Sequence, residues 1–334
     1  MSSASRVAVL GAGAWGTAFA CALAGRLDTM LWARDPQQAE ALAKTRSNER
    51  YLPGVALPEA LRVTPDLKLA AASDLLIAAT PVAALRDLLD QLRRHAPPAG
   101  QAPLIWLCKG FEQSTGLLAH EIVGQESGNG ASHGALSGPS FALEVARGLP
   151  CALTLAARDE TFARQAAGLL HGGRMRVYHT TDLVGVELGG AIKNVLAIAV
   201  GISDGLAMGQ NARAALITRG LAEMTRLGIA MGGLPQTFMG LAGAGDLILT
   251  TTGELSRNRR VGLELARGRA LPEILAALGH VAEGVSSAGA VARLAAQKGV
   301  EMPVSDAVRR VLEGQIAPAE AAEQLLAREP KLEH

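Results

Sequence analysis

The residues best suited to chemistry in this chain are Lys193 and Asn194, which stand side by side inside an apolar segment. That segment, Leu188–Ile202, reads LGGAIKNVLAIAVGI, and thirteen of its fifteen residues are apolar or glycine. This composition predicts a buried helix, in which a lysine is costly unless it is paired or used. Lysine, unlike arginine, gives up a proton when burial lowers its pKa. The pattern favours a proton-carrying lysine, and the alternative is a lysine whose charged end reaches solvent.

Three further charged residues stand where a ligand could be recognised. Lys109 follows the predicted strand Leu104–Cys108, and ligands of open α/β sheets bind at the carboxyl ends of strands. Asp246 could balance the charge of a nearby lysine, and Arg257 has the planar fork that recognises a phosphate. The alternatives are a surface lysine for Lys109 and a solvated basic loop for Arg257, and the residue types alone leave them open.

A glycine pattern near the N-terminus indicates a site for the phosphates of a dinucleotide. Gly11, Gly13 and Gly16 form G-x-G-x-x-G between the predicted strand Arg6–Leu10 and the predicted helix Trp15–Gly25. In that setting the first glycine permits a tight turn and the second admits the pyrophosphate. The third glycine lets helix and strand pack closely, and a purely structural turn is the alternative.

The end of the second predicted strand, Thr29–Ala33, bears on the choice of cofactor. An acidic residue there holds the ribose 2′-hydroxyl of NAD, whereas Arg34 suits the 2′-phosphate of NADP. The neighbouring Asp35 weakens this inference, and a solvated strand end is the alternative.

Two other loops carry weaker signals. Ser137–Ala142 reads as a turn into a helix with Ser140 as its N-cap, a geometry that also offers free N–H groups to an anion. Val281–Gly284 reads only as a loop with a carboxylate between two helical patterns.

Strand and helix signals alternate through the first half of the chain and then change. The predicted strands are Arg6–Leu10, Thr29–Ala33, Leu75–Ala79, Leu104–Cys108, Cys151–Ala156 and Arg176–Tyr178. Thr80-Pro81 predicts a helix start, with the threonine as N-cap. The alternation predicts an α/β fold with a doubly wound, Rossmann-like parallel sheet. The predicted helices after Asp182 include Leu216–Met231, Val285–Lys298, Pro303–Leu312 and Ala317–Ala327.

These patterns divide the chain into two expected domains. Residues 1–182 are expected to form the dinucleotide-binding domain, and residues 183–330 an all-helical substrate and catalytic domain.

The bulk composition excludes several classes of protein. A net charge of +1 leaves no basic footprint for nucleic acid or an anionic membrane. Three scattered cysteines have no metal-ligand spacing and indicate a reducing compartment. The apolar run at Val7–Leu10 is too short for a signal peptide, and the stretch around Lys193 falls short of a membrane span. We therefore expect a cytoplasmic protein with no metal site, and a homodimer is one open oligomeric state.

The motifs occur in an order that resembles the bacterial-type NAD(P)-dependent sn-glycerol-3-phosphate dehydrogenase family. The resemblance extends from Val7 to Ala327. The segments that carry it are GAGAWGTA, LCKGFE with TG close behind, SGPSFALEVARGLP, GVELGGAIKNVLAIAVGISDG, ARAALITRGLAEM, GLAGAGDLILT, SRNRR and VAEG. Each motif is moderately specific, and their combination is highly specific.

The resemblance implies a role for each candidate residue. Lys193 is the expected catalytic proton donor and acceptor, and Lys109 is expected near both substrate and cofactor. The implied substrate-binding residues are Lys109, Gly138, Ser140, Lys193, Asp246, Ser256, Arg257 and Asn258. The implied cofactor-binding residues are Gly11, Gly13, Trp15, Gly16, Arg34, Lys109, Ala142, Arg257, Val281 and Glu283. Two positions depart from the family pattern: Ala14 replaces a common serine, which removes a hydroxyl contact to the cofactor, and Ser140 replaces a common threonine, which keeps the hydroxyl.

The implied reaction is reversible hydride transfer between NADH or NADPH and dihydroxyacetone phosphate, which yields sn-glycerol 3-phosphate for glycerophospholipid synthesis. Lys193, as an ammonium, would stabilise the charge on the carbonyl oxygen and donate the proton. Burial and a second lysine would lower its pKa, and Asp246 would oppose that. The phosphate would be held by Arg257 and Asn258, remote from the reacting carbon.

Two other functions stay open at this point. One is a different dehydrogenase with a helical second domain, of the β-hydroxyacid or 6-phosphogluconate type, although GDLILT and SRNRR favour the phosphorylated triose. The other is a non-enzymatic dinucleotide sensor, against which the joint presence of Lys193, Lys109, Asp246 and Arg257 argues. The sequence does not settle the preference between NADH and NADPH.

Overall fold

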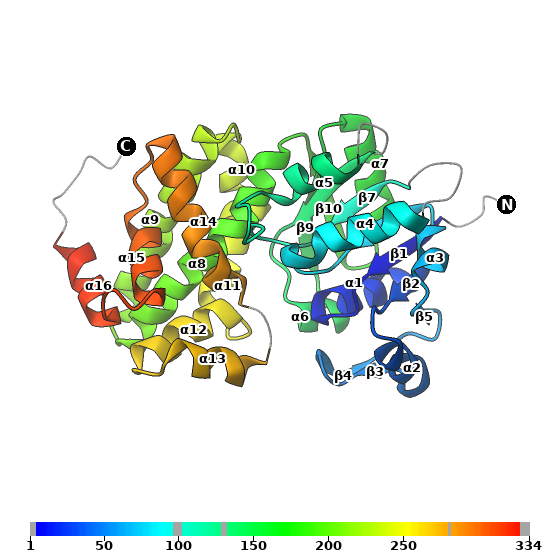
Figure 1. Ribbon diagram of the computed structural model, residues 1–334, viewed down its shortest axis with the longest axis horizontal. Coiled ribbons are helices and arrows are strands. Elements are labelled where there is room, and N and C mark those ends of the chain that lie inside the picture. Colours follow the sequence, from blue (N-terminus) through cyan, green and yellow to red (C-terminus); the bar gives the residue numbers. More distant parts are fainter. Residues whose placement is uncertain (1–4, 96–101, 128–131, 280–281, 328–334) are drawn as a thin grey trace. The chain divides into compact units, whose positions relative to one another are not determined.

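The chain folds into two compact units, Met1–Glu187 and Leu188–His334. The structure, a computed structural model, describes residues 5–95, 102–127, 132–279 and 282–327 (Figure 1). The boundary between the units falls within one continuous helix, α8 (Leu183–Gly205).

The first unit is built on an eight-stranded sheet with the order β10-β9-β8-β7-β6-β1-β2-β5. Its strands are β1 (Arg6–Leu10), β2 (Asp28–Trp32), β5 (Arg62–Thr64), β6 (Leu75–Ala78), β7 (Leu104–Trp106), β8 (His133–Ser137), β9 (Cys151–Ala156) and β10 (Met175–Thr180). A separate antiparallel pair joins β3 (Ser47–Asn48) to β4 (Leu52–Ala56). β1 pairs with β2 on one side and with β6 on the other, so the strand order extends from β1 in both directions, as in a doubly wound sheet.

The doubly wound sheet confirms the predicted fold class, with one difference at a single joint. β9 runs antiparallel to β8, whereas the other neighbouring strands of this sheet are parallel. The connection between them contains only a five-residue helix, α6 (Ala142–Ala146), which is about 7 Å long. A strand of five residues is about 16 Å long, so this helix is too short to carry the chain back along the sheet.

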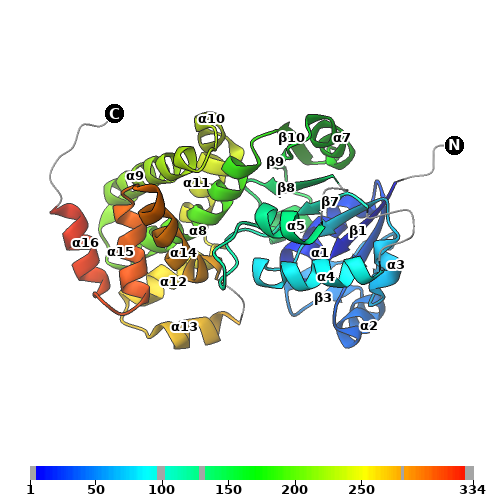
Figure 2. The same cartoon turned by 45° about the horizontal axis from the view of Figure 1, so that its top comes forward.

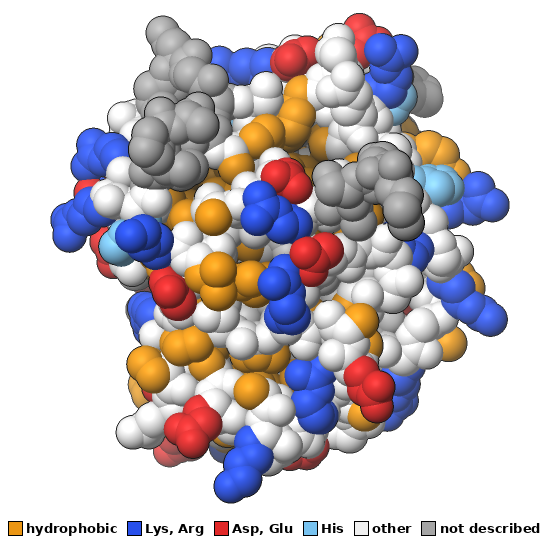
Figure 3. Space-filling view, turned by 90° about the vertical axis from the view of Figure 1, so that its right-hand side faces the viewer, with side chains coloured by type: hydrophobic (Ala, Val, Ile, Leu, Met, Phe, Trp, Pro, Cys, Tyr) orange, Lys and Arg blue, Asp and Glu red, His pale blue; other side chains and the backbone are white. Residues whose placement is uncertain are grey.

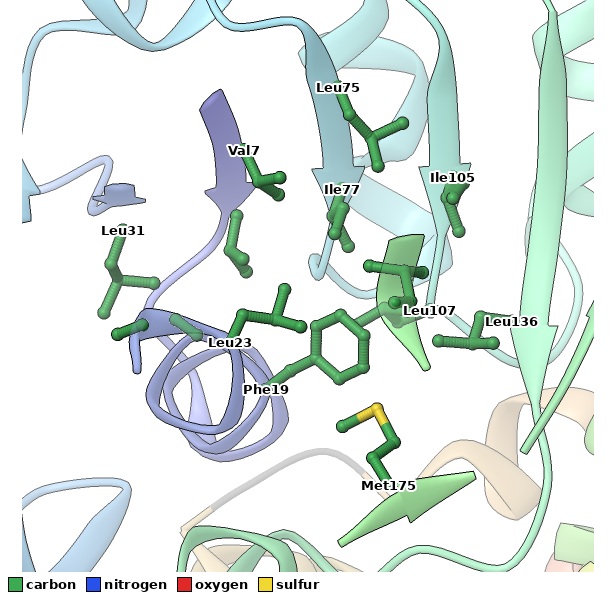
Figure 4. Close-up of a cluster of buried hydrophobic side chains, with 14 of the residues drawn as sticks. Val7, Phe19, Leu23, Leu31, Leu75, Ile77, Ile105, Leu107, Leu136 and Met175 are labelled. Atoms are coloured by element: carbon green, nitrogen blue, oxygen red, sulfur yellow. The ribbon is translucent and has the colours of Figure 1, made fainter. Parts of the chain in front are cut away.

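Helices pack on the sheet through apolar side chains. The helices of the first unit are α1 (Ala14–Ala24), α2 (Pro36–Thr45), α3 (Leu67–Ala71), the 3₁₀ turn η1 (Val82–Ala84), α4 (Leu85–His95), α5 (Ala119–Ser127), α6 and α7 (Glu160–Leu170). Phe19 and Leu23 of α1 meet the strand residues Val7, Ile77 and Ile105 in one buried cluster (Figure 4). α4 and α5 lie side by side in both ribbon views (Figures 1 and 2).

The second unit is helical, and no strand occurs among its described residues. After α8 its helices are α9 (Gly209–Ala230), α10 (Pro235–Met239), the π-helical turn η2 (Leu241–Gly245), α11 (Asp246–Thr252), α12 (Arg257–Ala266), α13 (Leu271–Leu278), α14 (Glu283–Lys298), α15 (Pro303–Leu312) and α16 (Pro318–Leu326). The expected change from strands to helices near Asp182 therefore occurs.

The predicted buried helix around Lys193 is α8, and it is longer than the sequence suggested. With 23 residues, it is long and apolar enough to cross a membrane by length and composition, so the expectation of a shorter segment was wrong. In the structure 94% of its most apolar window is buried, as in a core helix. Gly201 allows this burial, because a Cβ there would lie 2.1 Å from the carbonyl oxygen of Arg259 in α12.

Two predicted helix caps are wrong. Pro81, and not Thr80, precedes the turn η1, and the hydroxyl of Thr80 is buried without a hydrogen-bond partner among the described residues. Phe141 precedes α6, while the hydroxyl of Ser140 donates instead to the carbonyl oxygen of Gly138 at 2.9 Å. In neither place does the short polar side chain cap the helix, and the local sequence does not reveal this.

Basic and acidic side chains lie interspersed on the face of the molecule drawn in Figure 3. This distribution agrees with the net charge of +1. It gives that face no one-signed surface of the kind that nucleic acids or anionic membranes select.

Candidate active site

The glycine loop between β1 and α1 has the geometry of a phosphate-binding turn. Gly11 has a φ of +125°, and a Cβ there would lie 2.9 Å from the carbonyl oxygen of Ala79 at the end of β6. A Cβ on Gly16 would lie 2.0 Å from the carbonyl oxygen of Gly11. Packing within the protein therefore requires glycine at the first and third positions of the pattern.

The second glycine behaves differently, and it tests whether a dinucleotide fits. A Cβ on Gly13 would meet no atom of the described residues within 4 Å, and its φ of −77° suits any residue. Packing within the described chain therefore does not require glycine there. A pyrophosphate approaching the N-terminus of α1 does, because a side chain would stand in its way. The residues present fit the phosphates of a dinucleotide.

Two side chains that the sequence analysis missed hold this loop from outside. The amide nitrogens of Gln38 and Asn48 donate to the carbonyl oxygen of Ala12, at 2.9 and 3.1 Å. Asn48, which is 3% exposed, also donates to the hydroxyl of Thr17 at 2.7 Å. Neither residue has a recognisable motif, because what matters is its distance in space from a loop 26 or 36 residues away.

The residue expected to choose the cofactor is exposed and uncommitted within the described chain. Asp35 does not pair with Arg34, because its carboxylate caps α2 by accepting from the backbone N–H of Gln37 at 2.9 Å. Arg34 is exposed and has no ion pair or side-chain hydrogen bond with any residue that the structure describes. The guanidinium stands after β2, at the carboxyl edge of the sheet, where the adenosine ribose of a dinucleotide lies.

Two other predicted cofactor residues meet in a small apolar cluster. Trp15 of α1 and Ala142 of α6 both pack against a buried group formed by Ala18, Leu52 and Val55. The Trp15 ring also lies 5.5 Å from the ring of Phe19, centroid to centroid. This packing joins the start of α1 to α6 and β4.

Lys109, Gly138 and Ser140 come together at the carboxyl ends of β7 and β8. Lys109 Nζ lies 3.3 Å from the carbonyl oxygen of Gly138, which also accepts from the hydroxyl of Ser140. Gly138 has a φ of +138°, and a Cβ there would lie 3.0 Å from the carbonyl oxygen of Ala152 in β9. The backbone at this point requires glycine, and the carbonyl oxygen of Gly138 brings a lysine and a hydroxyl together.

Lys193 lies in a buried polar cluster inside the helical unit. Lys193 is 7% exposed, and its Nζ donates to Asp246 Oδ1 at 2.5 Å and to the hydroxyl of Thr250 at 2.8 Å. Asp246 and Thr250 are 1% and 5% exposed, and both stand on α11. A carboxylate at contact distance favours the charged form of a buried amine, so this geometry holds Lys193 as an ammonium. Thr250 was missed as a site residue, although its i,i+4 spacing from Asp246 puts both on one helix face.

The segment before Asp246 brings α11 unusually close to α8. Gly189 of α8 lies against η2, where a Cβ would be 2.5 Å from the carbonyl oxygen of Ala242. η2 is a π-helical turn, a rare element often found at functional sites. Gly189 therefore permits the close approach of η2 to α8 that precedes the contact of Asp246 with Lys193.

The neighbouring Asn194 belongs to a second buried network. Its side-chain oxygen accepts from the amide nitrogen of Asn258 at 2.9 Å, and Asn258 Oδ1 accepts from the backbone N–H of Gly284 at 2.9 Å. Asn258 is 4% exposed. Ser256 caps α12 by accepting from the backbone N–H of Arg259 at 3.2 Å. These contacts tie α8, α12 and the start of α14 together.

Arg257 and Glu283 lie at the exposed edge of this network. Arg257 Nη2 is 3.3 Å from Glu283 Oε1, and their side chains are 43% and 30% exposed. Glu283 is the first residue of α14, so the expected loop is helical from this point. Val281, an expected cofactor contact, lies outside the described residues.

The start of α8 is fixed by a buried carboxylate that sequence reasoning missed. Glu187 accepts from Trp106 Nε1 at 2.8 Å, from the backbone N–H of His120 at 3.0 Å and, in a short contact, from His120 Nδ1. Trp106 ends β7 and is fully buried. Burial first, and then the charge of Glu187, raises the pKa of the Cys108 thiol, so this cysteine is not an activated nucleophile.

The candidate residues thus form two groups, one within each unit. The first contains the glycine loop, Trp15, Arg34, Ala142 and the Lys109 cluster, and the second contains the Lys193 cluster, Ser256, Arg257, Asn258 and Glu283. Among the described residues no group of three or more His, Cys, Asp or Glu side chains could hold a metal ion.

Comparison with known proteins identifies the two units separately. Residues 6–163 match the family model described as NAD-dependent glycerol-3-phosphate dehydrogenase N-terminus, and residues 182–323 match the model of its C-terminus. A curated glycerol-3-phosphate dehydrogenase [NAD(P)+] from Aromatoleum aromaticum is 58% identical over 330 residues, which cover 98% of this chain and all of that relative.

Solved structures agree with this assignment. The crystal structure of a glycerol-3-phosphate dehydrogenase from Coxiella burnetii is 40% identical, with a TM-score of 0.92 over 97% of this chain and 99% of that chain. A ketopantoate reductase from Ralstonia eutropha is 13% identical, with a TM-score of 0.58 over 95% of this chain and 99% of that chain, and shares the fold alone.

Proposed function

This chain belongs to the NAD-dependent glycerol-3-phosphate dehydrogenase family, and we propose that it reduces dihydroxyacetone phosphate to sn-glycerol 3-phosphate with NADH or NADPH. The reaction is reversible, and it makes the chain an oxidoreductase. The observation that carries the proposal is the buried contact of Lys193 with Asp246 and Thr250, in a chain that matches the family over both units.

Lys193 is the proposed proton donor and acceptor. The nicotinamide cofactor supplies the hydride that reaches the ketone carbon. As negative charge develops on the carbonyl oxygen, the Lys193 ammonium stabilises it and transfers a proton to it. Asp246 supports this role, since its carboxylate favours the ammonium form from which the proton comes. Thr250 accepts a second hydrogen bond from the same nitrogen and limits its rotation.

The phosphate of the substrate is assigned to the edge of the buried network. Arg257 is exposed and has a long contact of 3.3 Å with Glu283, so its planar fork can exchange that carboxylate for a phosphate. Ser256 and Asn258 are assigned to substrate binding beside it. Because the side-chain nitrogen and oxygen of Asn258 each make one hydrogen bond within the network, this residue also holds the edge in shape.

Most of the remaining assignments belong to the first unit, and Arg257, Val281 and Glu283 belong to the second. Lys109, Gly138 and Ser140 are proposed to bind substrate, because they present a cation and a hydroxyl at the ligand-binding edge of the sheet. Gly11, Gly13 and Gly16 suit the pyrophosphate of the cofactor and Arg34 its ribose end. The other proposed cofactor contacts are Trp15, Lys109, Ala142, Arg257, Val281 and Glu283.

Four broader properties are proposed with this function. The expected reducing compartment makes the enzyme cytoplasmic, and its product feeds glycerophospholipid synthesis. The dinucleotide-binding domain ends near residue 182 and the helical catalytic domain follows. A homodimer is the proposed oligomeric state, and light scattering during size-exclusion chromatography gives the mass that checks it.

A spectrophotometric assay tests the function. The oxidation of NADH and of NADPH is followed by the absorbance of the reduced nicotinamide, with dihydroxyacetone phosphate as substrate. Unphosphorylated dihydroxyacetone is the control, and it should react much more slowly. Equal rates on the two ketones would contradict the substrate assignment, and no oxidation with either would contradict the reaction.

A further inference from the structure

The segment that carries Lys109 has no regular structure of its own. From Leu107 to Leu118 the chain forms neither helix nor strand, and Gly110 follows the lysine with a φ of +117°. A loop of this length is held in one conformation only by contacts made with its side chains and backbone. The described structure shows where those contacts converge.

Glu112 is the point at which this loop is tied together. It is 6% exposed, and its carboxylate accepts from the Thr115 hydroxyl at 2.6 Å. Its backbone N–H donates to Leu117 at 2.9 Å, and its carbonyl oxygen accepts from Gly116 at 2.7 Å. A buried carboxylate of this kind needs a cation, and α4 supplies it.

Arg86 of α4 forms a two-pronged ion pair with Glu112 through the planar fork of its guanidinium. Nε and Nη2 donate to the two carboxylate oxygens at 2.9 and 2.8 Å, and Nη1 donates to Glu126 of α5 at 2.7 Å. The hydrogen bonds from Arg86 hold the pKa of Glu112 below its ordinary value of 4.5, against the opposing effect of burial. Arg86 of α4 therefore binds the loop through a two-pronged, charge-assisted contact with Glu112 and binds α5 through a single one with Glu126.

We propose that Arg86 and Glu112 are positioning residues for Lys109, and this inference rests on the proposed function, in which Lys109 contacts the substrate. Glu112 stands three residues after Lys109, so the chain between them spans at most about 10 Å. Fixing Glu112 limits where Lys109 can lie, and the contact of Lys109 Nζ with the carbonyl oxygen of Gly138 defines its direction. Neither Arg86 nor Glu112 needs to touch the substrate.

A double-mutant cycle separates this role from a purely structural one. Arg86→Met removes the fork while keeping an apolar stem, and we expect kcat/KM for dihydroxyacetone phosphate to fall about 10–100-fold, mainly through KM. In a Lys109→Met background the same change should have an effect of less than about threefold, because the group it positions is already gone. A full 10–100-fold loss in both backgrounds would overturn the proposal.

Two further variants guard against misreading a folding defect. Glu112→Gln keeps the side-chain volume, and we expect it to lower kcat/KM in the same direction as Arg86→Met. Arg26→Met is the matched control, since Arg26 also donates twice, to the carbonyl oxygens of Leu170 and His171 at the end of α7, at 2.9 Å each. It should lower the unfolding midpoint and leave KM unchanged. A rise in KM with Arg26→Met equal to that with Arg86→Met would contradict the inference.

A second measurement tests the clamp, the contact of Arg86 with Glu112, without turnover. Failure of the proposed function is therefore recognised separately. The acetylation rate of Lys109 by acetic anhydride is followed by peptide mass spectrometry in the full chain. It should rise several-fold in Arg86→Met and stay at the wild-type rate in Arg26→Met, because a loosened loop frees the amine. An unchanged rate in Arg86→Met refutes the clamp. A wild-type chain that does not reduce the ketone refutes the proposed function, while the labelling still decides whether the loop is held.

Discussion

Replacing Lys193 by methionine is expected to affect both stability and turnover, and the structure gives the size of each effect. Methionine fits the volume of the site, but it leaves Asp246 buried at 1% exposure without its cation. Breaking one side of a buried ion pair costs about 3–5 kcal/mol of unfolding free energy. For a chain of 334 residues that unfolds in one step, with an unfolding entropy of about 0.7 kcal/mol/K, this lowers the unfolding midpoint by about 4–7 °C.

A second substitution separates the two effects. In Lys193→Met/Asp246→Asn the buried charge is removed as well, so most of the lost stability should return. Turnover should not return, because no proton donor has been restored. We expect kcat to fall about 10²–10⁴-fold in both variants, the usual contribution of a general acid or base.

The assay combines thermal unfolding with steady-state reduction of dihydroxyacetone phosphate, and Lys298→Met is the control. Lys298 ends α14 and is exposed, so its loss should cost no more than about 1 kcal/mol and leave kcat unchanged. If Lys193→Met unfolds like the wild type, the pair with Asp246 does not form in solution. If it keeps more than about a tenth of the wild-type kcat, Lys193 is not the proton carrier.

Three other changes give separate tests. Arg34→Asp should lower the NADPH/NADH affinity ratio at least about tenfold, because a carboxylate that repels the 2′-phosphate replaces a cation uncommitted within the described chain. Fluorescence titration at fixed low salt measures both dissociation constants, and an unchanged ratio would mean that another residue sets the cofactor preference. Arg257→Ala should lower kcat/KM for the phosphorylated ketone about 10–100-fold and spare dihydroxyacetone, and equal losses on both ketones would remove its role as phosphate anchor. The lowered pKa of Glu112 adds stability that is complete above its unfolded value of 4.5 and is lost as the pH falls through the lower folded value. Unfolding midpoints should therefore fall less steeply between neutral and acid pH in Glu112→Gln than in the wild type, and parallel curves would show that the pair contributes nothing.

Much of the first unit could be predicted because its signals are local. The apolar runs of β1, β2, β6 and β9 are short, continuous and followed by turn residues, and each was predicted within one residue at either end. β8 was missed, since HGALS has neither a long apolar run nor alternation. The pair β3–β4 was missed as well. β3 has only two residues and β4 contains a proline, so their strand conformation depends on pairing with each other more than on their own residues.

In the candidate site, too, local sequence predicted some residues and the fold decided the partners of others. Residue type and burial singled out Lys193, because a lysine within an apolar helix is unusual whatever its neighbours are. The partners could not be derived in that way, because Asp246 lies 53 residues further on and its contact with Lys193 follows the close approach at Gly189 and the π-helical turn η2. The caps assigned to Thr80 and Ser140 failed for other reasons: the hydroxyl of Ser140 donates to the carbonyl oxygen of Gly138 two residues earlier, and the hydroxyl of Thr80 has no hydrogen-bond partner among the described residues.

The sequence by itself determined the strand–helix alternation, the glycine turn, the buried helix with its lysine and the family to which the chain belongs. These follow from patterns a few residues long, whose physical cause is the geometry of the local backbone. Only the tertiary structure decided that Glu187 secures the start of α8 and that Arg86 holds the Lys109 loop through Glu112. Each of those contacts joins side chains whose distance is set by packing, because hydrogen bonds and ion pairs form only where the fold brings their atoms within about 3 Å.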